Sequence, residues 1–320
     1  MFNIGIIGLG HISEKHIVAI QNNSELCLTG GYDIDMDKAR TWCKTHNTNM
    51  YDSLDRIIQE NDILVVLTPH HTHSSIVKEI VLKNKWCICE KPLCIKASEF
   101  DGFEKDNKVF VIFQNRYNKA IIEAKNKIES DVLGKINFMQ LNTLWYRNMD
   151  YYIKSDWRGK VDTEGGILYN QGIHSIDVAL YLLNANFSDC KILSAEKYNY
   201  HPGLINTESV VKFVMHVKGV LVDMFVTTEF ATSNYENSLL VSGTKSSIKI
   251  SGNHLNKVVY PENVIFDDTN DIYGASHIEN YRQILQYIKD GKGNPVFFSE
   301  GLDRIKLIEN IYNVCINKRS

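Results

Sequence analysis

The hydrophobic positions in the first third of the chain alternate between two spacings. Longer segments with helical spacing separate short runs rich in valine and isoleucine. Apolar runs of this length predict buried strands, and the segments between them predict amphipathic helices. The predicted strands cover residues 4–7, 26–32, 63–67, 86–89 and 109–113, and the predicted helices cover 35–45, 53–59, 74–83 and 98–105. Because the connections are short, we expect a parallel α/β sheet wrapped by helices.

The pattern changes after Gly134, and the domain boundary is expected earlier, at residue 118. A helical stripe over 119–129 leads into longer stretches that alternate hydrophobic and polar residues. Runs of strands joined by turns predict a mostly antiparallel sheet. The expected strands are 135–146, 191–200, 209–215, 220–228, 236–242 and 246–251, and the expected helices are 171–183, 277–289 and 300–317. We therefore predict two domains, an α/β domain over 1–118 and an α+β domain over 119–320.

Composition excludes several classes of protein. Hydrophobic residues make up 44% of the 320 residues, which is enough to bury two cores and argues against disorder. A net charge of -3 argues against nucleic-acid binding driven by bulk charge. No apolar run approaches the roughly 18 residues of a membrane helix, and the first residues lack a signal-peptide pattern. Seven cysteines, an odd number, suit reduced thiols. We expect a cytoplasmic protein.

A glycine-rich turn follows the first predicted strand. Residues 8–13 read GLGHIS, a G-x-G-x-x-S pattern. Gly8 permits a tight turn, and Gly10 lets the backbone approach a pyrophosphate at a helix N-terminus. Asp33 ends the second predicted strand, where a carboxylate can accept hydrogen bonds from an adenosine ribose. The spacing predicts a dinucleotide site that includes Gly8, Gly10, His11, Ile12 and Asp33.

Acidic residues after Asp33 favour NAD over NADP. Asp35 and Asp37 follow it, and no arginine occurs in that turn. The 2'-phosphate of NADP would meet like charge there. Asp35 itself is better explained as the N-cap of the next helix.

A second candidate site lies where the third predicted strand ends. Residues 68–73 read TPHHTH, at the sheet edge where ligands bind in doubly wound folds. We interpret this segment as a loop that lines a nicotinamide pocket, with Thr68, Pro69 and His73 in contact. His70 and His71 could equally be exposed loop residues. The histidines lack an acidic or cysteine ligand nearby, so we expect no metal here, nor at Cys87 and Cys89.

The fourth predicted strand ends in Glu90-Lys91-Pro92. A lysine at a sheet edge could donate a hydrogen bond to a substrate oxygen or take part in acid–base chemistry. It could equally be a surface lysine paired with Glu90. The residues alone leave both interpretations open.

These motifs, together with GIHSID at 172–177, resemble the Gfo/Idh/MocA oxidoreductase family over nearly the whole chain. The resemblance implies an N-terminal Rossmann domain that binds NAD, a C-terminal domain with a large open sheet, and hydride transfer from a sugar or polyol carbon. Lys91 matches the lysine of the family, and His174 matches its histidine. Asn170 departs from the pattern, because an aspartate is common four residues before that histidine.

Three further segments resemble the WlbA/WbpB branch of the family: QNRY at 114–117, YYIKSDWRG at 151–159 and GGILYNQ at 165–171. The branch oxidises C3 of UDP-N-acetylglucosaminuronate to a 3-keto sugar, which a pyridoxal-phosphate (PLP) aminotransferase takes toward the O-antigen of lipopolysaccharide. It implies a homodimer or homotetramer and, in some members, recycling of NADH by 2-oxoglutarate. The competing interpretations are a polyol or inositol dehydrogenase, an NADPH-dependent deoxysugar-nucleotide 3-ketoreductase, and a catalytically silent NAD-binding regulator.

The expected roles follow from the resemblance and from helix geometry. Asn170 and His174 share one face if the segment is an α-helix, and Asp177 can hold that helix. Lys91 or His174 would accept the hydroxyl proton, and the other would donate to the developing carbonyl oxygen; the sequence does not decide between them.

An anionic nucleotide sugar also needs local cations, for which Arg116, Arg147 and Arg158 are candidates and Arg158 is favoured. Arg147 could equally form a surface salt bridge, and His277 could equally lie at the surface. The expected substrate contacts are Asn170, Arg158, Tyr152, Gln171 and His277. The expected cofactor contacts are Gly8, Gly10, His11, Ile12, Asp33, Thr68, Pro69, His73, Glu90, Lys91, Asn115 and Arg116.

Overall fold

The computed structural model describes residues 1–103, 108–261, 263–265 and 272–317. The chain forms two compact units, each made of two segments. The first unit comprises Met1–Gln114 and Tyr273–Leu302, and the second comprises Asn115–Ile272 and Asp303–Ser320. The chain passes into the second unit after Gln114, close to the expected boundary at residue 118. It returns to the first unit at Tyr273, so that unit contains a second segment that the expected domain 1–118 lacks.

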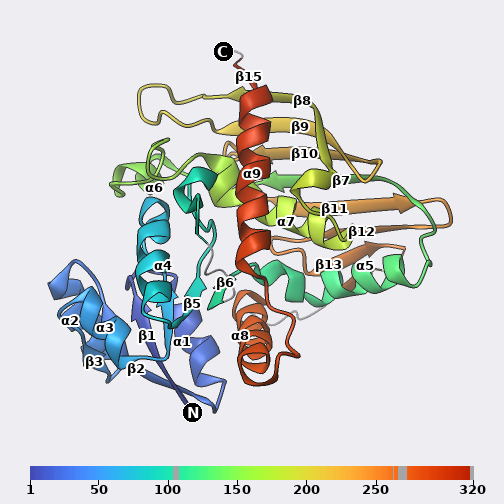
Figure 1. The fold of residues 1–320 in the computed structure, drawn as a ribbon. Coiled ribbons are helices and arrows are strands. Elements are labelled where there is room, and N and C mark those ends of the chain that lie inside the picture. The colour runs from blue at the N-terminus through green and yellow to red at the C-terminus, as the bar shows by residue number, and fades with distance from the viewer. Residues whose placement is uncertain (104–107, 262, 266–271, 318–320) are drawn as a thin grey trace. The chain divides into compact units, whose positions relative to one another are not determined.

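The first unit is built on a parallel sheet of six strands in the described chain, in the order β3-β2-β1-β4-β5-β6 (Figure 1). Its strands are β1 (Phe2–Ile7), β2 (Leu26–Tyr32), β3 (Asn49–Met50), β4 (Ile63–Val66), β5 (Trp86–Cys89) and β6 (Val109–Val111). Its early helices are α1 (Ser13–Gln21), α2 (Met36–Thr45), α3 (Leu54–Glu60) and α4 (His73–Leu82). This confirms the predicted doubly wound α/β fold, and the strand order reverses at β1, between β2 and β4.

Burial explains why these short runs become strands. All four residues of β4 are buried, as a parallel strand with both faces covered requires. The helix α8 (Ile272–Asp290), from near the end of the chain, adds Tyr281, Ile284 and Leu285 to the core that β1, β4 and β5 form. The second segment of this unit is therefore part of its hydrophobic core.

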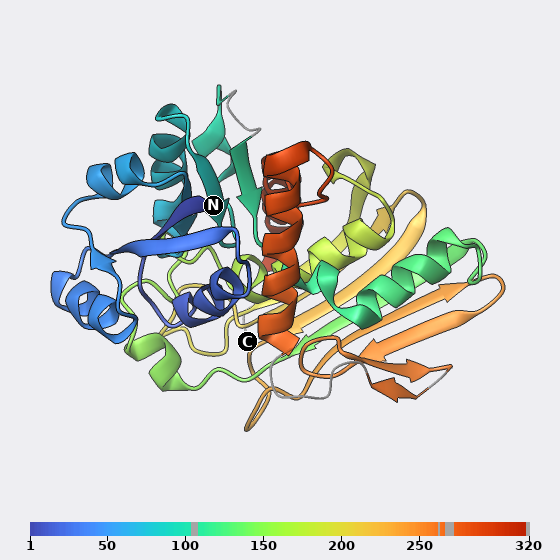
Figure 2. The same cartoon turned by 90° about the horizontal axis from the view of Figure 1, so that it is seen from below.

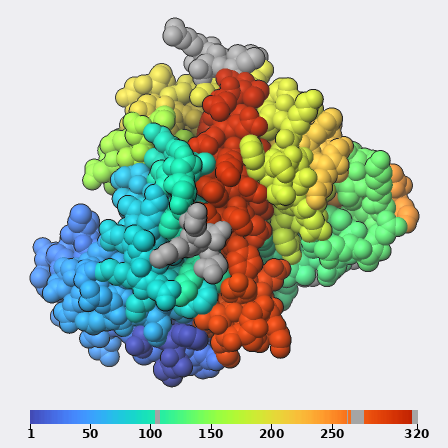
Figure 3. Space-filling view, viewed as in Figure 1, coloured from blue at the N-terminus to red at the C-terminus, as the bar shows by residue number. Residues whose placement is uncertain are grey.

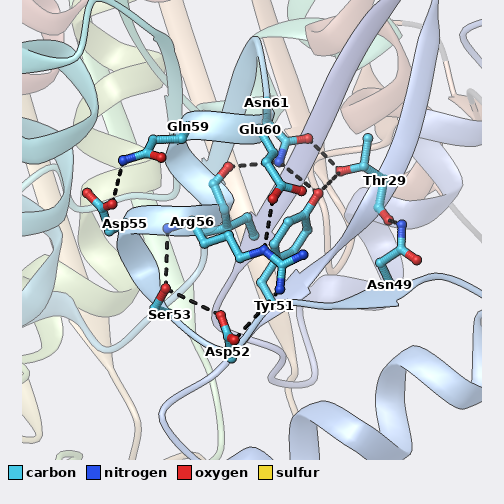
Figure 4. Close-up of polar contacts among 11 residues, drawn as sticks. Thr29, Asn49, Tyr51, Asp52, Ser53, Asp55, Arg56, Gln59, Glu60 and Asn61 are labelled. Carbon is cyan, nitrogen blue, oxygen red and sulfur yellow. Dashed lines mark hydrogen bonds and ion pairs between the residues drawn. The ribbon is translucent and has the colours of Figure 1, made fainter.

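Polar contacts tie α3 to β2 (Figure 4). Asn61, buried just after α3, donates from Nδ2 to the Ile57 carbonyl at 2.8 Å and accepts from the Thr29 hydroxyl. The Ser53 hydroxyl caps α3 by accepting the Arg56 N–H at 3.3 Å. Figure 3 shows the residues of α2 and α3, coloured blue, at the surface. The buried Asn61 side chain therefore links α3 to β2, while the outer face of α3 is exposed.

The second unit contains a nine-stranded sheet in the described residues, in the order β14-β13-β12-β11-β7-β10-β9-β8-β15. Only the pairs β7–β10 and β8–β15 are parallel among those described, which confirms the predicted mostly antiparallel sheet. The strands are β7 (Ile136–Leu144), β8 (Cys190–Tyr198), β9 (Val210–Val217), β10 (Val220–Thr227), β11 (Glu236–Gly243), β12 (Ser247–Ser251), β13 (Lys257–Tyr260), β14 (Val264–Ile265) and β15 (Ile316–Asn317).

Helices α5 (Lys119–Glu129) and α7 (Ile173–Leu182) pack against this sheet (Figure 2). Nine of the ten residues of α7 are buried, as expected for a helix that is apolar on nearly every side. The short helix α6 (Met149–Ile153) follows β7, and α9 (Phe298–Val314) ends the helical part of the chain. The fold therefore buries α7, the element that carries His174.

Several predicted elements differ from the observed ones. Over 98–105 the described residues form only a 3₁₀ turn, Ala97–Phe100, and residues 104–107 lie outside the described chain. The last predicted helix ends at Val314, because Ile316–Asn317 pairs with β8 as a strand. The two-residue strands β3, β14 and β15 are too short for a period to be read from sequence. None of the described helices is long and apolar enough to cross a bilayer.

Candidate active site

The two glycines of the turn after β1 differ in backbone conformation and in the space around them. Gly8 has a φ of +91°, and its N–H donates to the Tyr32 carbonyl at 2.8 Å. A Cβ at Gly8 would lie 2.8 Å from the Leu67 backbone, whereas a Cβ at Gly10 would meet nothing within 4 Å. The fold itself therefore requires glycine at position 8. The open space beside Gly10 fits the close backbone approach that a pyrophosphate needs.

Asp33 fastens this turn to the end of β2. Its Oδ2 accepts the Leu9 N–H at 2.8 Å and the Lys38 ammonium at 2.6 Å, and its Oδ1 accepts the Asp35 N–H at 3.1 Å. Burial alone would raise the pKa of Asp33, but these hydrogen bonds lower it below its usual value. Asp35 caps α2 as expected, by accepting from the Asp37 and Lys38 N–H groups. Asp33 is thus an ionised acceptor beside the turn, with a lysine contact that the sequence analysis missed.

His73 braces the loops that follow β4 and β5. Its Nδ1 lies 2.7 Å from the Pro92 carbonyl, and its Nε2 lies 2.7 Å from the Thr68 carbonyl. Burial lowers the pKa of His73, and the two carbonyl contacts oppose that shift. Backbone carbonyls engage both ring nitrogens, so His73 links two loops and does not offer a ring nitrogen for the expected cofactor contact. Of the other loop histidines, His70 is buried and His71 is exposed.

Glu90 lies at the centre of a buried polar cluster in the first unit. Its Oε1 is 3.1 Å from His16 Nε2 and 3.7 Å from His277 Nε2, and its Oε2 accepts the Lys91 N–H at 3.1 Å. The Tyr281 hydroxyl lies 2.8 Å from His16 Nδ1. His277 was expected at the substrate, but the structure buries it completely beside Glu90. The sequence analysis missed His16, although a histidine among the buried residues of α1 was a visible signal.

In the second unit, Asn170 lies in a π-helix, Leu168–Gly172, that leads into α7. In a π-helix the bonds run from i to i+5, so the argument that Asn170 and His174 share an α-helical face does not apply to this turn. Asn170 Nδ2 donates to the Tyr151 hydroxyl at 2.9 Å and to Glu164 Oε1. Glu164, a buried residue that the sequence analysis missed, also accepts the Gly159 N–H at 2.6 Å. Both amide hydrogens of Asn170 are therefore engaged within the protein.

Two arginines flank Tyr151. The guanidinium carbon of Arg158 is 4.1 Å from the Tyr151 ring centroid, and that of Arg147 is 5.1 Å from it. Arg147 also donates to Asn234 Oδ1 at 3.0 Å. Within the described parts of the chain, the Nε atoms of both arginines are buried without a hydrogen-bond partner. Arg147, Tyr151 and Arg158 form what we call the cationic corner.

Tyr152 and Gln171, both expected at the substrate, are buried. The Tyr152 hydroxyl lies 3.4 Å from the Thr228 hydroxyl, and burial raises the pKa of Tyr152 to about 12. The tyrosine that contacts Asn170 is thus Tyr151, its neighbour in the chain.

Arg116 was expected at the cofactor, but the structure pairs it with Asp177. Its Nε and Nη2 donate to the two oxygens of Asp177 at 2.8 Å and 2.6 Å, and Arg304 Nε donates at 2.9 Å. All three side chains are buried. Burial would raise the pKa of Asp177, but the two guanidinium groups lower it below its usual value. Asp177 therefore fastens α7 to α9 and to the segment before α5, and Asn115 beside Arg116 stays a prediction.

The strand order, the glycine turn and Asp33 define a dinucleotide-binding Rossmann domain in the first unit. Residues 2–105 match the Gfo/Idh/MocA model described as an oxidoreductase family with an NAD-binding Rossmann fold, and residues 121–249 match the Gfo/Idh/MocA C-terminal domain. The protein belongs to the Gfo/Idh/MocA oxidoreductase family and is an NAD-dependent dehydrogenase.

Two curated relatives are dehydrogenases of sugars or polyols. Glucose-6-phosphate 3-dehydrogenase of Bacillus subtilis is 29% identical over 196 residues, which span 58% of this chain and 55% of that enzyme. Myo-inositol 2-dehydrogenase of Thermotoga maritima is 22% identical over 326 residues, which span 93% of this chain and 91% of that enzyme.

Solved structures share the fold. The WlbA dehydrogenase from Bordetella pertussis, in complex with NADH and UDP-GlcNAcA, aligns with a TM-score of 0.85 at 22% identity over 98% of this chain and 94% of that one. Levoglucosan dehydrogenase, in complex with NADH and L-sorbose, aligns with a TM-score of 0.87 at 18% identity over 98% of both chains.

Alanine substitutions at the two glycines should separate folding from cofactor binding. Gly10→Ala should change the unfolding free energy by no more than about 0.5 kcal/mol, because its Cβ meets nothing within 4 Å. It should weaken NAD binding at least about tenfold, because the methyl group occupies the approach of the pyrophosphate. Gly8→Ala should instead destabilise the fold by about 1–3 kcal/mol, owing to its positive φ. Urea unfolding and calorimetric titration with NAD measure both effects; wild-type affinity in Gly10→Ala would exclude this turn as the pyrophosphate site.

Proposed function

We propose that the protein oxidises the C3 hydroxyl of a nucleotide-linked sugar acid, UDP-N-acetylglucosaminuronate or a close analogue, with NAD as the hydride acceptor. The observation that carries this proposal is the cationic corner beside Asn170, in which Arg147 and Arg158 each have an Nε donor without a partner among the described residues. Guanidinium groups bind carboxylates and phosphates through paired hydrogen bonds. A neutral polyol would not need two such cations.

The state of Asn170 supports an anionic substrate. Its side chain is neutral, and its amide hydrogens donate to Tyr151 and Glu164. An aspartate at this position would place a negative charge near the substrate acid, and like charges disfavour each other.

The chemistry requires that a hydride leaves C3 while the hydroxyl loses a proton. NAD, when bound, supplies the hydride acceptor. Lys91 or His174 accepts the proton, and the other donates a hydrogen bond to the developing carbonyl oxygen. We retain Gly8, Gly10, His11, Ile12, Asp33, Thr68, Pro69, Glu90, Lys91 and Asn115 as proposed cofactor contacts, and Arg158, Asn170 and Gln171 as proposed substrate contacts.

The proposal includes the setting of the reaction. The keto product is suited to a PLP aminotransferase that acts toward lipopolysaccharide O-antigen, and 2-oxoglutarate could reoxidise the NADH. The similarity to WlbA dehydrogenases that bind UDP-GlcNAcA supports this choice of substrate. We further propose that the protein acts as a homodimer or homotetramer.

A second candidate is the oxidation of a simpler sugar or polyol. The curated relatives named above act, by their names, on glucose 6-phosphate and on myo-inositol. Glucose 6-phosphate also carries an anionic group that the cationic corner could bind, whereas myo-inositol carries none.

The test is anaerobic incubation of the protein with NAD, 2-oxoglutarate and one of three substrates: UDP-N-acetylglucosaminuronate, glucose 6-phosphate or myo-inositol. Chromatography should detect 2-hydroxyglutarate and a keto sugar nucleotide in the first sample. Arg158→Met should raise KM for the sugar nucleotide about 10–100-fold, the loss expected for a charge-assisted hydrogen bond, with the affinity for NAD unchanged. Arg56→Met, which changes an arginine on α3 with a half-exposed side chain, is the matched control. Turnover of myo-inositol alone would reject the proposal in favour of the second candidate.

A further inference from the structure

We propose that His16, His277 and Tyr281 are positioning residues that hold the Glu90 carboxylate in place, and that Glu90 in turn fixes the backbone and the electrostatic environment of Lys91. The inference rests on the proposed function in one respect, namely that Lys91 takes part in the reaction. None of the three positioning residues needs to touch substrate or cofactor. His16 lies on α1, and His277 and Tyr281 lie on α8.

The donor and acceptor chemistry of the partners determines the direction of each bond. A carboxylate only accepts hydrogen bonds, so His16 Nε2, 3.1 Å from Glu90 Oε1, carries the proton. In neutral imidazole Nδ1 is then an acceptor, and it accepts from the Tyr281 hydroxyl at 2.8 Å. A directed chain therefore runs from Tyr281 through His16 to Glu90. The second oxygen of Glu90 accepts the Lys91 N–H at 3.1 Å and completes the connection to Lys91.

Burial makes this chain sensitive to the loss of a member. His16, His277 and Tyr281 are 0% exposed, and Glu90 is 8% exposed. A buried carboxylate stays ionised only when donors compensate for the lost water. Burial alone would raise the pKa of Glu90, but the two histidines lower it well below its usual value. Burial lowers the pKa of His16, which agrees with a neutral ring.

A fixed negative charge at Glu90 has a consequence for its neighbour. A nearby carboxylate favours the ammonium form of a lysine, so removal of that charge lowers the lysine pKa. The groups that face or influence Glu90 are His16 on α1, His277 and Tyr281 on α8, His73 on α4, and Cys89 and Lys91 beside it in the chain. Of the substitutions among these residues, Glu90→Gln removes the carboxylate charge itself.

The same residues include donors that suit a metal ion, because one atom each from His16, Glu90 and His277 lie within 4.8 Å of one another. Hydrogen bonding accounts better for the geometry. Each ring nitrogen of His16 has a hydrogen-bond partner, and each oxygen of Glu90 has one as well. Metal analysis of the purified protein is nevertheless part of the test.

The test measures the titration of Lys91 directly and needs no substrate. The NAD-loaded protein is acylated with isotope-labelled acetic anhydride over a range of pH, and peptide mass spectrometry gives the midpoint at Lys91. Lys44, exposed on α2, is the internal reference. Glu90→Gln should lower the Lys91 midpoint by about one pH unit, the lower end of the effect of a neighbouring opposite charge, with no change at Lys44. His16→Leu keeps the charge but removes its donor, so it should lower the midpoint by a smaller amount. His16→Gln should restore the wild-type midpoint, because its amide can donate to Glu90 as Nε2 does.

Two further measurements keep the outcome decisive. Tyr281→Phe removes one hydroxyl group, and it should shift the Lys91 midpoint in the same direction by a smaller amount even if His16→Leu does not fold. An unchanged midpoint in Glu90→Gln, or one equivalent of bound metal in the wild-type protein, would overturn the proposal. A shifted midpoint in a protein that oxidises none of the three substrates would reject the proposed function and leave the positioning role supported.

Discussion

Replacement of Lys91 by methionine should lower the rate of hydride transfer about 10²–10⁴-fold, the range typical of a lost general acid or base. Methionine keeps most of the length of the side chain but has no proton to give or take. Lys91 lies two residues after the end of β5, at the carboxyl edge of the parallel sheet where ligands bind, and Glu90 accepts its backbone N–H. Single-turnover formation of NADH measures the change. The affinity for NAD, measured by calorimetry, should fall far less than the rate, because only one proposed cofactor contact is lost and the glycine turn and Asp33 are intact.

The matched control is Lys44→Met, because Lys44 is exposed on α2 and lies outside the proposed machinery. It should transfer hydride at the wild-type rate. His174→Ala should also slow the reaction, and the pH profiles of the two variants would show which group accepts the proton. Near-normal rates in both Lys91→Met and His174→Ala would reject both assignments.

Replacement of Asp177 by alanine should cause the largest loss of stability, about 3–5 kcal/mol, because removal of one member of a buried ion pair leaves a buried charge uncompensated. Arg116 and Arg304 both depend on this carboxylate, and all three side chains are buried. Urea unfolding measures the loss in the second unit. Asp150→Asn, which breaks the exposed pair between Asp150 on α6 and Lys154 just after it, should cost no more than about 1 kcal/mol.

The stabilising effect of Asp177 should depend on pH in a defined direction. Its pKa is lower in the folded protein than the usual aspartate value of about 3.9. A carboxyl group of this kind stabilises the fold above its unfolded pKa, and the contribution is lost as the pH falls through the folded pKa. The unfolding free energy of Asp177→Asn should therefore lack this acid-dependent part. Equal acid sensitivity in the variant and the wild type would contradict the assignment.

The sequence predicted those features that depend on local pattern. The strands β4 and β5 are unbroken apolar runs, and Gly8 is required by a turn whose form is visible in six residues. Asp35 was predicted correctly as an N-cap because a cap involves only the next few residues. In each case the cause lies within one element or its immediate neighbour.

The missed features arise from contacts between distant parts of the chain. Arg116 was assigned to the cofactor, and only the fold shows that Asp177 takes its guanidinium. The role of Glu164 was not predicted because its contact with Asn170, six residues further on, depends on how the backbone turns between them. His16 and His277 are far apart in sequence, and each has a role only beside Glu90. A single sequence contains no record of such pairings.

Because the first unit consists of two distant segments, the order of synthesis determines when it can fold. Domains commonly fold as units, the N-terminal one first, while synthesis continues. Here the contact between the buried His16 and Tyr281 cannot form until Tyr281, 265 positions further along the chain, has been made. The nascent sheet of Met1–Gln114 must therefore wait for Tyr273–Leu302, after nearly all of the second unit has been translated. Until then, the apolar surface that α8 later covers stays exposed, and the dinucleotide-binding unit can be completed only once Tyr273–Leu302 has been made.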